Sequence, residues 1–149
     1  MADKEVVTAE RFFDHPIEEV FRSYTDHEGW SRWAGLGKVT LVREGTPERD
    51  GVGSVRAFRL TPGLREEVTR FEPPARMEYK VVAGPVPMAD HLGEVMFESE
   101  GNGTRLRWRV SFRSTIPGAG WALRHGLGVV FRRVLARLAR DMESGHQGR

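Results

Sequence analysis

The stretch RHGLGVVFRRVLARLARDME, residues 124–143, has the pattern of a long amphipathic helix. When successive residues are placed ~100° apart, the apolar side chains fall within an arc of roughly 140° and the arginines fall outside it. The apolar residues are Leu123, Leu127, Val130, Phe131, Val134, Leu135, Leu138 and Met142. We therefore predict a helix from about residue 119 to residue 143 that lies against an apolar surface.

Two glycines, Gly126 and Gly128, lie on the two flanks of this apolar arc. A glycine inside a helix is less favourable than an alanine by about 1 kcal/mol, so the pair needs a reason. Either the missing side chains let neighbouring backbone approach closely, or they border an opening through which a ligand enters. The sequence leaves both explanations open.

The apolar surface that this helix needs is supplied by short β-strand patterns between residues 38 and 113. Six such runs are separated by turn signals such as TPG, EPP and EGNG, so the simplest arrangement is an antiparallel meander. The last run, TRLRWRVSF at residues 104–112, alternates apolar residues with arginines. Such alternation is typical of a strand with one face in the core and the other in solvent.

The beginning of the chain completes the element order. Residues 5–13 are rich in β-formers, and residues 14–35 read as two short helical segments, the second of which contains Trp30 and Trp33. We therefore predict a single α+β domain over residues 1–149, with a core at about 5–143 and a polar tail at 144–149. A curved seven-stranded antiparallel sheet wrapped around the C-terminal helix makes an internal cavity plausible.

The composition narrows the function classes. The chain has 149 residues, no cysteine and a net charge of +2. Disulfides, thiolate nucleophiles and cysteine-based metal sites are excluded, and the mild charge gives no reason to expect a nucleic acid partner. No apolar run is long enough for a transmembrane segment and the start is not a secretory signal, so we expect a cytoplasmic protein. The five histidines lack metal-ligand spacing and no phosphate-binding glycine motif occurs, so neither a metal nor a cofactor is predicted.

Four longer stretches carry a family resemblance: FFDHPIEEVFRSYTDHEGWSRW (12–33), GVGSVRAF (51–58), EEVTRFEPPARMEY (66–79) and GNGTRLRWRVSF (101–112). They resemble the START/Bet v 1-like (SRPBCC) superfamily, in particular its bacterial polyketide cyclase/dehydrase and lipid-transport branch, over about residues 5–143. The resemblance implies the helix-grip fold, with a hydrophobic cavity that takes lipids, sterols or polyketides. Some members catalyse cyclisation or dehydration, whereas many only bind a ligand.

The resemblance also implies which residues face the cavity. On the fourth strand they are Glu67, Thr69 and Phe71, and on the sixth they are His91, Gly93, Val95 and Phe97. Together with the short helices and the closing helix, this gives a predicted ligand-binding set of Trp30, Trp33, Thr69, Phe71, Val95, Phe97, Leu127, Phe131 and Leu135. Plain core packing is the alternative explanation for the aromatic and aliphatic members.

Two residues are candidates for proton transfer. His91 is the best acid/base candidate, because a partly buried imidazole titrates near neutrality, whereas Asp90 would point to the opposite side of a regular strand. Glu67, if it faces inward, would need a cation such as Arg56 or Arg59. Alternatively, His91 binds a backbone carbonyl or faces solvent, and the charges form cross-strand pairs on the wet face.

Three functions follow from these observations. The first is binding of a small hydrophobic or amphipathic molecule, lipid-, sterol- or polyketide-like, between the sheet and the C-terminal helix. The second is a polyketide cyclase/dehydrase-type enzyme that uses His91 and Glu67. The third is a protein-interaction module of the co-chaperone kind, which would expose an apolar patch. The sequence leaves open whether the protein is a monomer or a homodimer.

Overall fold

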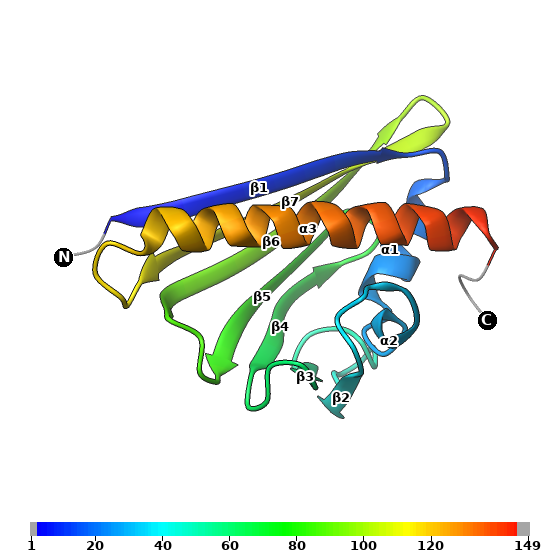
Figure 1. Ribbon diagram of the computed structural model, residues 1–149. Coiled ribbons are helices and arrows are strands. Elements are labelled where there is room, and N and C mark those ends of the chain that lie inside the picture. The colour runs from blue at the N-terminus through cyan, green and yellow to red at the C-terminus, as the bar shows by residue number, and fades with distance from the viewer. Residues whose placement is uncertain (1–2, 146–149) are drawn as a thin grey trace.

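The computed structural model describes residues 3–145, which form a seven-stranded antiparallel sheet in the order β1-β7-β6-β5-β4-β3-β2 (Figure 1). Consecutive strands from β2 to β7 are neighbours, and β1 pairs with β7 along its whole length. This confirms the predicted meander. The strands are β1 (Lys4–Phe13), β2 (Val39–Arg43), β3 (Val55–Phe58), β4 (Arg65–Glu72), β5 (Arg76–Ala83), β6 (Met88–Glu100) and β7 (Gly103–Ser114).

Three helices lie against the sheet: α1 (Ile17–Thr25), α2 (Trp30–Trp33) and α3 (Gly120–Glu143). Figure 1 shows α3 crossing one side of the sheet beside β1, with α1 and α2 near its C-terminal end. The predicted helix-grip architecture is therefore confirmed. Of the predicted tail, residues 146–149 lie outside the described residues. Within residues 3–145, no helix is long and apolar enough to cross a membrane.

The strand register breaks at two places that matter for the site. In β4 the pairing with β5 shifts between Val68 and Arg70, and in β6 the pairing with β7 shifts between Ala89 and Leu92. Asp90, inside the second irregularity, has a φ of 52°. An extra residue in one strand reverses which later side chains face inward. Simple alternation therefore fails along both strands.

An aromatic cluster fills one end of the space between α3 and the sheet. The ring centroids of Phe21 and Phe97 are 4.9 Å apart, and those of Tyr24 and Trp108 are 5.5 Å apart. Trp30 donates a 2.8 Å hydrogen bond from its indole N–H to the Tyr24 carbonyl, which satisfies a polar group that would otherwise be buried alone. This end of the molecule is solid core.

The two halves of α3 differ in burial. From Phe131 onward the helix buries Phe131, Val134, Leu135, Leu138 and Met142. In the first half Trp121 is 62% exposed, and Val129 and Val130 are also exposed. The helix is therefore anchored by its C-terminal half.

The two helix glycines do not face the cavity. A Cβ atom added at Gly126 would meet nothing within 4 Å, and Gly126 is exposed. Gly128 is buried against β1, where an added Cβ would lie 3.5 Å from Val7, an ordinary contact, and 3.1 Å from the flexible end of Arg132. Gly128 therefore lies where α3 packs against β1, whereas Gly126 has no packing role.

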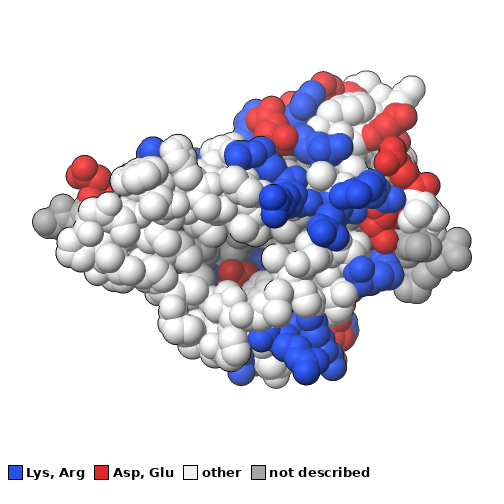
Figure 2. Space-filling model, viewed as in Figure 1, with Lys and Arg blue, Asp and Glu red and all other residues white. Residues whose placement is uncertain are grey.

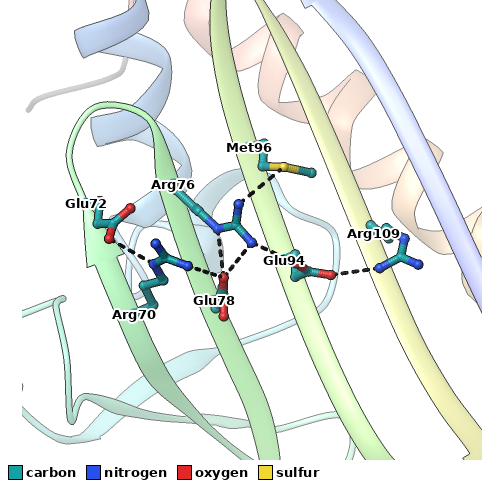
Figure 3. A network of polar contacts seen from close by, with 7 residues as sticks. All are labelled: Arg70, Glu72, Arg76, Glu78, Glu94, Met96 and Arg109. Atoms are coloured by element: carbon teal, nitrogen blue, oxygen red, sulfur yellow. Dashed lines mark hydrogen bonds and ion pairs between the residues drawn. The ribbon is translucent and has the colours of Figure 1, made fainter.

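The opposite face of the sheet carries a ladder of ion pairs (Figure 3). Arg76 on β5 contacts Glu78 on the same strand at 2.7 Å and Glu94 on β6 at 2.8 Å. Glu94 in turn accepts a 2.9 Å bond from Arg109 on β7, and Arg70 on β4 reaches Glu78 at 3.3 Å. This ladder, Arg70–Glu78–Arg76–Glu94–Arg109, spans four strands on the face of the sheet that points away from α3.

Candidate functional site

A cavity of about 290 Å³ lies between α3 and strands β3 to β7, beyond the aromatic cluster. Figure 2 shows a hollow beside α3 with acidic atoms at its bottom and mainly uncharged residues around it. The lining residues are mostly apolar, and the charged ones are Arg56 and Glu66. The lining comprises Trp30, Leu36, Arg56, Phe58, Leu60, Thr61, Leu64, Glu66, Tyr79, Val81, Val86, Met88, His91, Trp108, Val110, Leu127, Val130 and Phe131.

Four of the predicted site residues line this cavity. Trp30 comes from α2, His91 from β6, and Leu127 and Phe131 from α3. The Phe131 ring stacks on Trp108 with centroids 4.0 Å apart. These four come from three elements that are distant in the sequence, so the fold brings them together.

Five predicted residues belong to the packing around the cavity and do not line it. Phe71 is half-buried and contacts Phe21 with ring centroids 5.3 Å apart. Four others are buried in the core, namely Trp33, Val95, Phe97 and Leu135. These five residues contribute no surface to the cavity.

The predicted inward orientation of Glu67 and Thr69 is wrong. Thr69 is exposed, and Glu67 pairs with Arg43 at 3.2 Å without lining the cavity. Glu66 and Val68 face inward instead, and the bulge after Val68 returns Phe71 to the inner side. One inserted residue explains why the predicted inward orientation is correct for Phe71 and wrong for Glu67 and Thr69.

The inward carboxylate, Glu66, is paired with Arg56 across β3 and β4. The Arg56 guanidinium donates from Nε and Nη2 to the same oxygen, Glu66 Oε1, at 2.8 and 2.7 Å. The Arg56 side chain is only 2% exposed. A buried charge of this kind requires a partner; Arg56, predicted together with Arg59 as a possible partner of Glu67, is instead bonded to the neighbouring Glu66.

Aromatic rings enclose the Arg56 guanidinium. Its Cζ atom lies 4.8 Å from the ring centroids of both Trp30 and Tyr79. Burial alone would lower the pKa of Arg56, but the charge of Glu66 and the nearby Tyr24 and Tyr79 raise it overall. The guanidinium is therefore a permanent cation at the inner end of an apolar cavity.

His27 accepts a hydrogen bond from the Arg56 guanidinium. Its Nδ1 accepts a 3.3 Å bond from Arg56 Nη1, and its Nε2 lies 3.0 Å from the Asp50 carbonyl. A carbonyl only accepts, so Nε2 carries the proton and Nδ1 is the acceptor. Burial and the charge of Arg56 lower the pKa of His27 to about 3. His27 is therefore neutral at physiological pH.

Tyr79 has its position because Gly93 lies opposite it on β6. The two residues are cross-strand partners, and any Cβ at position 93 would overlap the tyrosine ring. The Tyr79 hydroxyl accepts a 2.8 Å bond from the Trp108 indole N–H. Burial and the charge of Glu66 raise the pKa of Tyr79 above its usual value, so the hydroxyl keeps its proton.

His91, the predicted acid/base candidate, lines the cavity, and its Nδ1 atom is bonded to the backbone of β5. Its Nδ1 accepts a 3.1 Å bond from the Val81 backbone N–H, so the single proton of the neutral ring lies on Nε2. Burial is the main reason that the pKa of His91 is lowered. Asp90 pairs with Arg113 at 3.3 Å on the surface and does not orient the imidazole.

Three polar groups around Arg56 are not predicted from the sequence, namely Glu66, His27 and the Tyr79 hydroxyl. A signal existed for Arg56, because the apolar Phe58, two residues later, shares its side of β3. Nothing comparable marked His27, whose partners lie 23 and 29 residues away in the chain. Across residues 3–145 no group of three or more acidic, histidine or cysteine side chains could hold a metal ion.

Comparison with known proteins supports the same architecture. Residues 4–143 match the protein family described as polyketide cyclase/dehydrase and lipid transport. This is the branch that the sequence motifs resemble. No curated protein sequence matches the chain significantly.

Solved structures show the same fold at low identity. A protein from Thermobifida fusca is 20% identical with a TM-score of 0.77, and 97% of each chain is covered. Ara h 8.0201 is 11% identical with a TM-score of 0.66, covering 91% of this chain and 98% of that one. DynU16, from the dynemicin biosynthetic locus, is 19% identical with a TM-score of 0.69, covering 97% of this chain and 49% of that one.

Proposed function

Since the chain belongs to the polyketide cyclase/dehydrase and lipid transport family, we propose that it binds a small, mostly apolar molecule in the cavity between α3 and the sheet. One observation carries this proposal. The cavity combines a largely apolar lining with a buried, charged inner end at Arg56 and Glu66. An apolar lining with a few placed polar groups is the usual composition of a ligand pocket.

The free energy of burying apolar surface favours a ligand with a large apolar part. Apolar surface removed from water contributes about 25 cal/mol per Å² before the entropic cost of association. The cavity mouth lies among side chains that are themselves exposed, including Leu60 and Val130. A ligand that covers these side chains removes their apolar surface from water as well as its own.

The positions of the two predicted catalytic residues, Glu67 and His91, do not favour the enzymatic alternative. Glu67 lies outside the cavity, and the Nδ1 atom of His91 is occupied by the Val81 N–H. A general base needs a free lone pair within reach of a substrate proton. We therefore place binding before cyclase or dehydrase chemistry.

Two neighbouring valines on α3 provide the test. Val130 lines the cavity and Val129 does not, and both are exposed. Fluorescence titration with the neutral apolar probe N-phenyl-1-naphthylamine should show saturable binding to the unmodified chain. Val130→Trp should weaken that binding at least tenfold by filling the mouth, whereas Val129→Trp should leave it unchanged.

Either of two results would refute the proposal. One is the absence of saturable uptake by the unmodified chain. The other is an equal effect of the two tryptophans, which would indicate that the probe binds to exposed surface, as the interaction-module alternative predicts.

A further inference from the structure

Three side chains that line the cavity have hydrogen-bonding capacity that no described residue uses. The Tyr79 hydroxyl accepts from Trp108, but its own proton has no acceptor within residues 3–145. The His91 Nε2–H likewise has no acceptor in this part of the chain. Both bonds from Arg56 to Glu66 end on Glu66 Oε1, which leaves Glu66 Oε2 without a donor there.

The unused atoms of Glu66 and His91 border open space. The fully enclosed side-chain atoms without a partner are elsewhere, on Ser23, Tyr24 and Ser54. Unpartnered atoms of Glu66 and His91 are therefore accessible from the cavity that both residues line. Tyr79 lines the same cavity and is only 2% exposed.

The three groups surround one end of the cavity. The rings of Tyr79 and His91 have centroids 5.5 Å apart. Arg56 lies over the Tyr79 ring and is itself bonded to Glu66. Besides the Arg56 cation, the inner end therefore offers two neutral donors, Tyr79 O–H and His91 Nε2–H, and one acceptor, Glu66 Oε2.

A hydroxyl group matches this set. Its oxygen has two lone pairs and one proton, so it can accept twice and donate once. A ketone or ether accepts only and leaves the carboxylate oxygen without a donor. A carboxylate lacks a proton and brings a second negative charge toward Glu66.

We propose that the cavity selects a ligand with a neutral hydroxyl at its inner end, such as a phenol or an enol, on an apolar body. The hydroxyl accepts from Tyr79 and His91 and donates to Glu66. The body has about the size of two fused rings, because a cavity of about 290 Å³ is at the small end for ligand pockets. This assignment rests on the proposed binding function.

The protonation states agree with the assignment. Burial keeps the pKa of Tyr79 high and that of His91 low, so both groups are neutral donors near pH 7. The Val81 N–H also prevents His91 from carrying its proton on Nδ1. The donor pattern is therefore fixed over the neutral pH range.

Three naphthalenes that differ in one substituent test the assignment. Displacement of N-phenyl-1-naphthylamine at pH 7 gives the affinities of 2-naphthol, 2-methoxynaphthalene and 2-naphthoate. We expect 2-naphthol to bind about tenfold or more tightly than its methyl ether, because the ether leaves a buried acceptor unpaired, and 2-naphthoate to bind most weakly. Equal affinities of the naphthol and the ether would overturn the assignment.

The ratio of naphthol to ether affinity is also the readout for variants. Glu66→Gln and Tyr79→Phe should each lower this ratio about fivefold or more, since each removes one partner of the hydroxyl. Glu67→Gln, one position away and outside the cavity, should leave it unchanged. A general loss of packing would weaken both ligands together, so an unchanged ratio in Glu66→Gln and Tyr79→Phe would overturn the assignment.

The two proposals fail in different ways. If the unmodified chain does not bind N-phenyl-1-naphthylamine, the binding function is refuted. If the probe binds and is displaced equally by the naphthol and the ether, binding stands and the hydroxyl assignment is refuted.

Discussion

The sheet carries arginine–glutamate contacts on both faces, and the contacts have almost the same geometry. On the outer face Arg76 lies 2.8 Å from Glu94, and on the inner face Arg56 lies 2.7 Å from Glu66. The Arg76 side chain is 29% exposed, whereas that of Arg56 is 2% exposed; their partners Glu94 and Glu66 differ little, at 15% and 13%, so the difference lies in the arginines. The contact distance does not distinguish the two regions, and the access of water does.

Water access also separates their consequences. An exposed ion pair contributes about 0.2–1 kcal/mol, because water and salt screen both charges. In a buried pair, removal of one partner leaves an uncompensated charge, which costs about 3–5 kcal/mol. The outer ladder of Figure 3 thus contributes modestly to the stability of the sheet. The inner pair is a fixed feature beside the cavity.

The largest expected effect comes from the inner pair. Arg56→Met should lower the free energy of unfolding by about 3–5 kcal/mol, because Glu66 stays buried without its partner. Adding Glu66→Met should restore much of this loss, since a buried apolar pair of similar volume is tolerated. Urea denaturation of the single and double variants measures both effects.

Arg76→Met on the outer face is the matched control. It should lower the free energy of unfolding by about 1 kcal/mol or less, even though Arg76 contacts two glutamates. Equal losses in Arg56→Met and Arg76→Met would contradict the distinction between the two faces.

The next effect compares a glycine packed against a buried side chain with an exposed glycine. Gly93→Ala should destabilise the protein by about 1–3 kcal/mol, because a methyl group would overlap the buried Tyr79 ring. Gly126→Ala on α3 should instead stabilise it by up to about 1 kcal/mol, since open space surrounds that position. Thermal unfolding followed by circular dichroism compares the two, and a stabilising Gly93→Ala would be the contrary outcome.

The smallest effect is a pH dependence from His27. Its folded-state pKa of about 3 lies below the ordinary value of 6.5, so the unfolded chain binds a proton that the native state refuses. Stability from this group is complete above pH 6.5 and falls as the pH drops toward 3. Between pH 6.5 and 5.5 the free energy of unfolding should fall by about 1 kcal/mol.

His27→Gln isolates this contribution. Chemical denaturation at both pH values should show a smaller difference in the variant, whatever its absolute stability. Exposed carboxylates interfere little in this range, because their ordinary pKa values lie near 4, and the contribution of His91, whose pKa burial also lowers, is common to both chains. An identical difference in both chains would show that His27 is not the group responsible.

The fold was predictable because its signals repeat. The 3.6-residue period of α3 and the two-residue alternation of β7 each extend over many residues, so a single irregular position does not hide them. The site was less predictable because it depends on single insertions. The bulge at Thr69 exchanges Glu67 for Glu66 as the inward carboxylate, and no residue type in that stretch announces a bulge.

Histidine chemistry shows a second limit. The family resemblance placed His91 on the cavity side of its strand, where the structure also has it, yet its chemical role depends on which ring nitrogen the Val81 backbone N–H occupies. The buried His27 gave no sequence signal at all, since its environment is built by Arg56 and Asp50. Residue type and spacing do not encode such contacts; only the folded chain does.

The uneven anchoring of α3 has a consequence for ligand exchange. Its first half rests on few buried side chains, whereas Phe131 and the residues after it are held in the core. Segments with few buried contacts open at lower free energy than the rest of a domain. We therefore expect the part of α3 that carries Leu127 and Val130 to open at lower free energy than the rest of the domain, which would let a molecule enter or leave while the sheet stays intact.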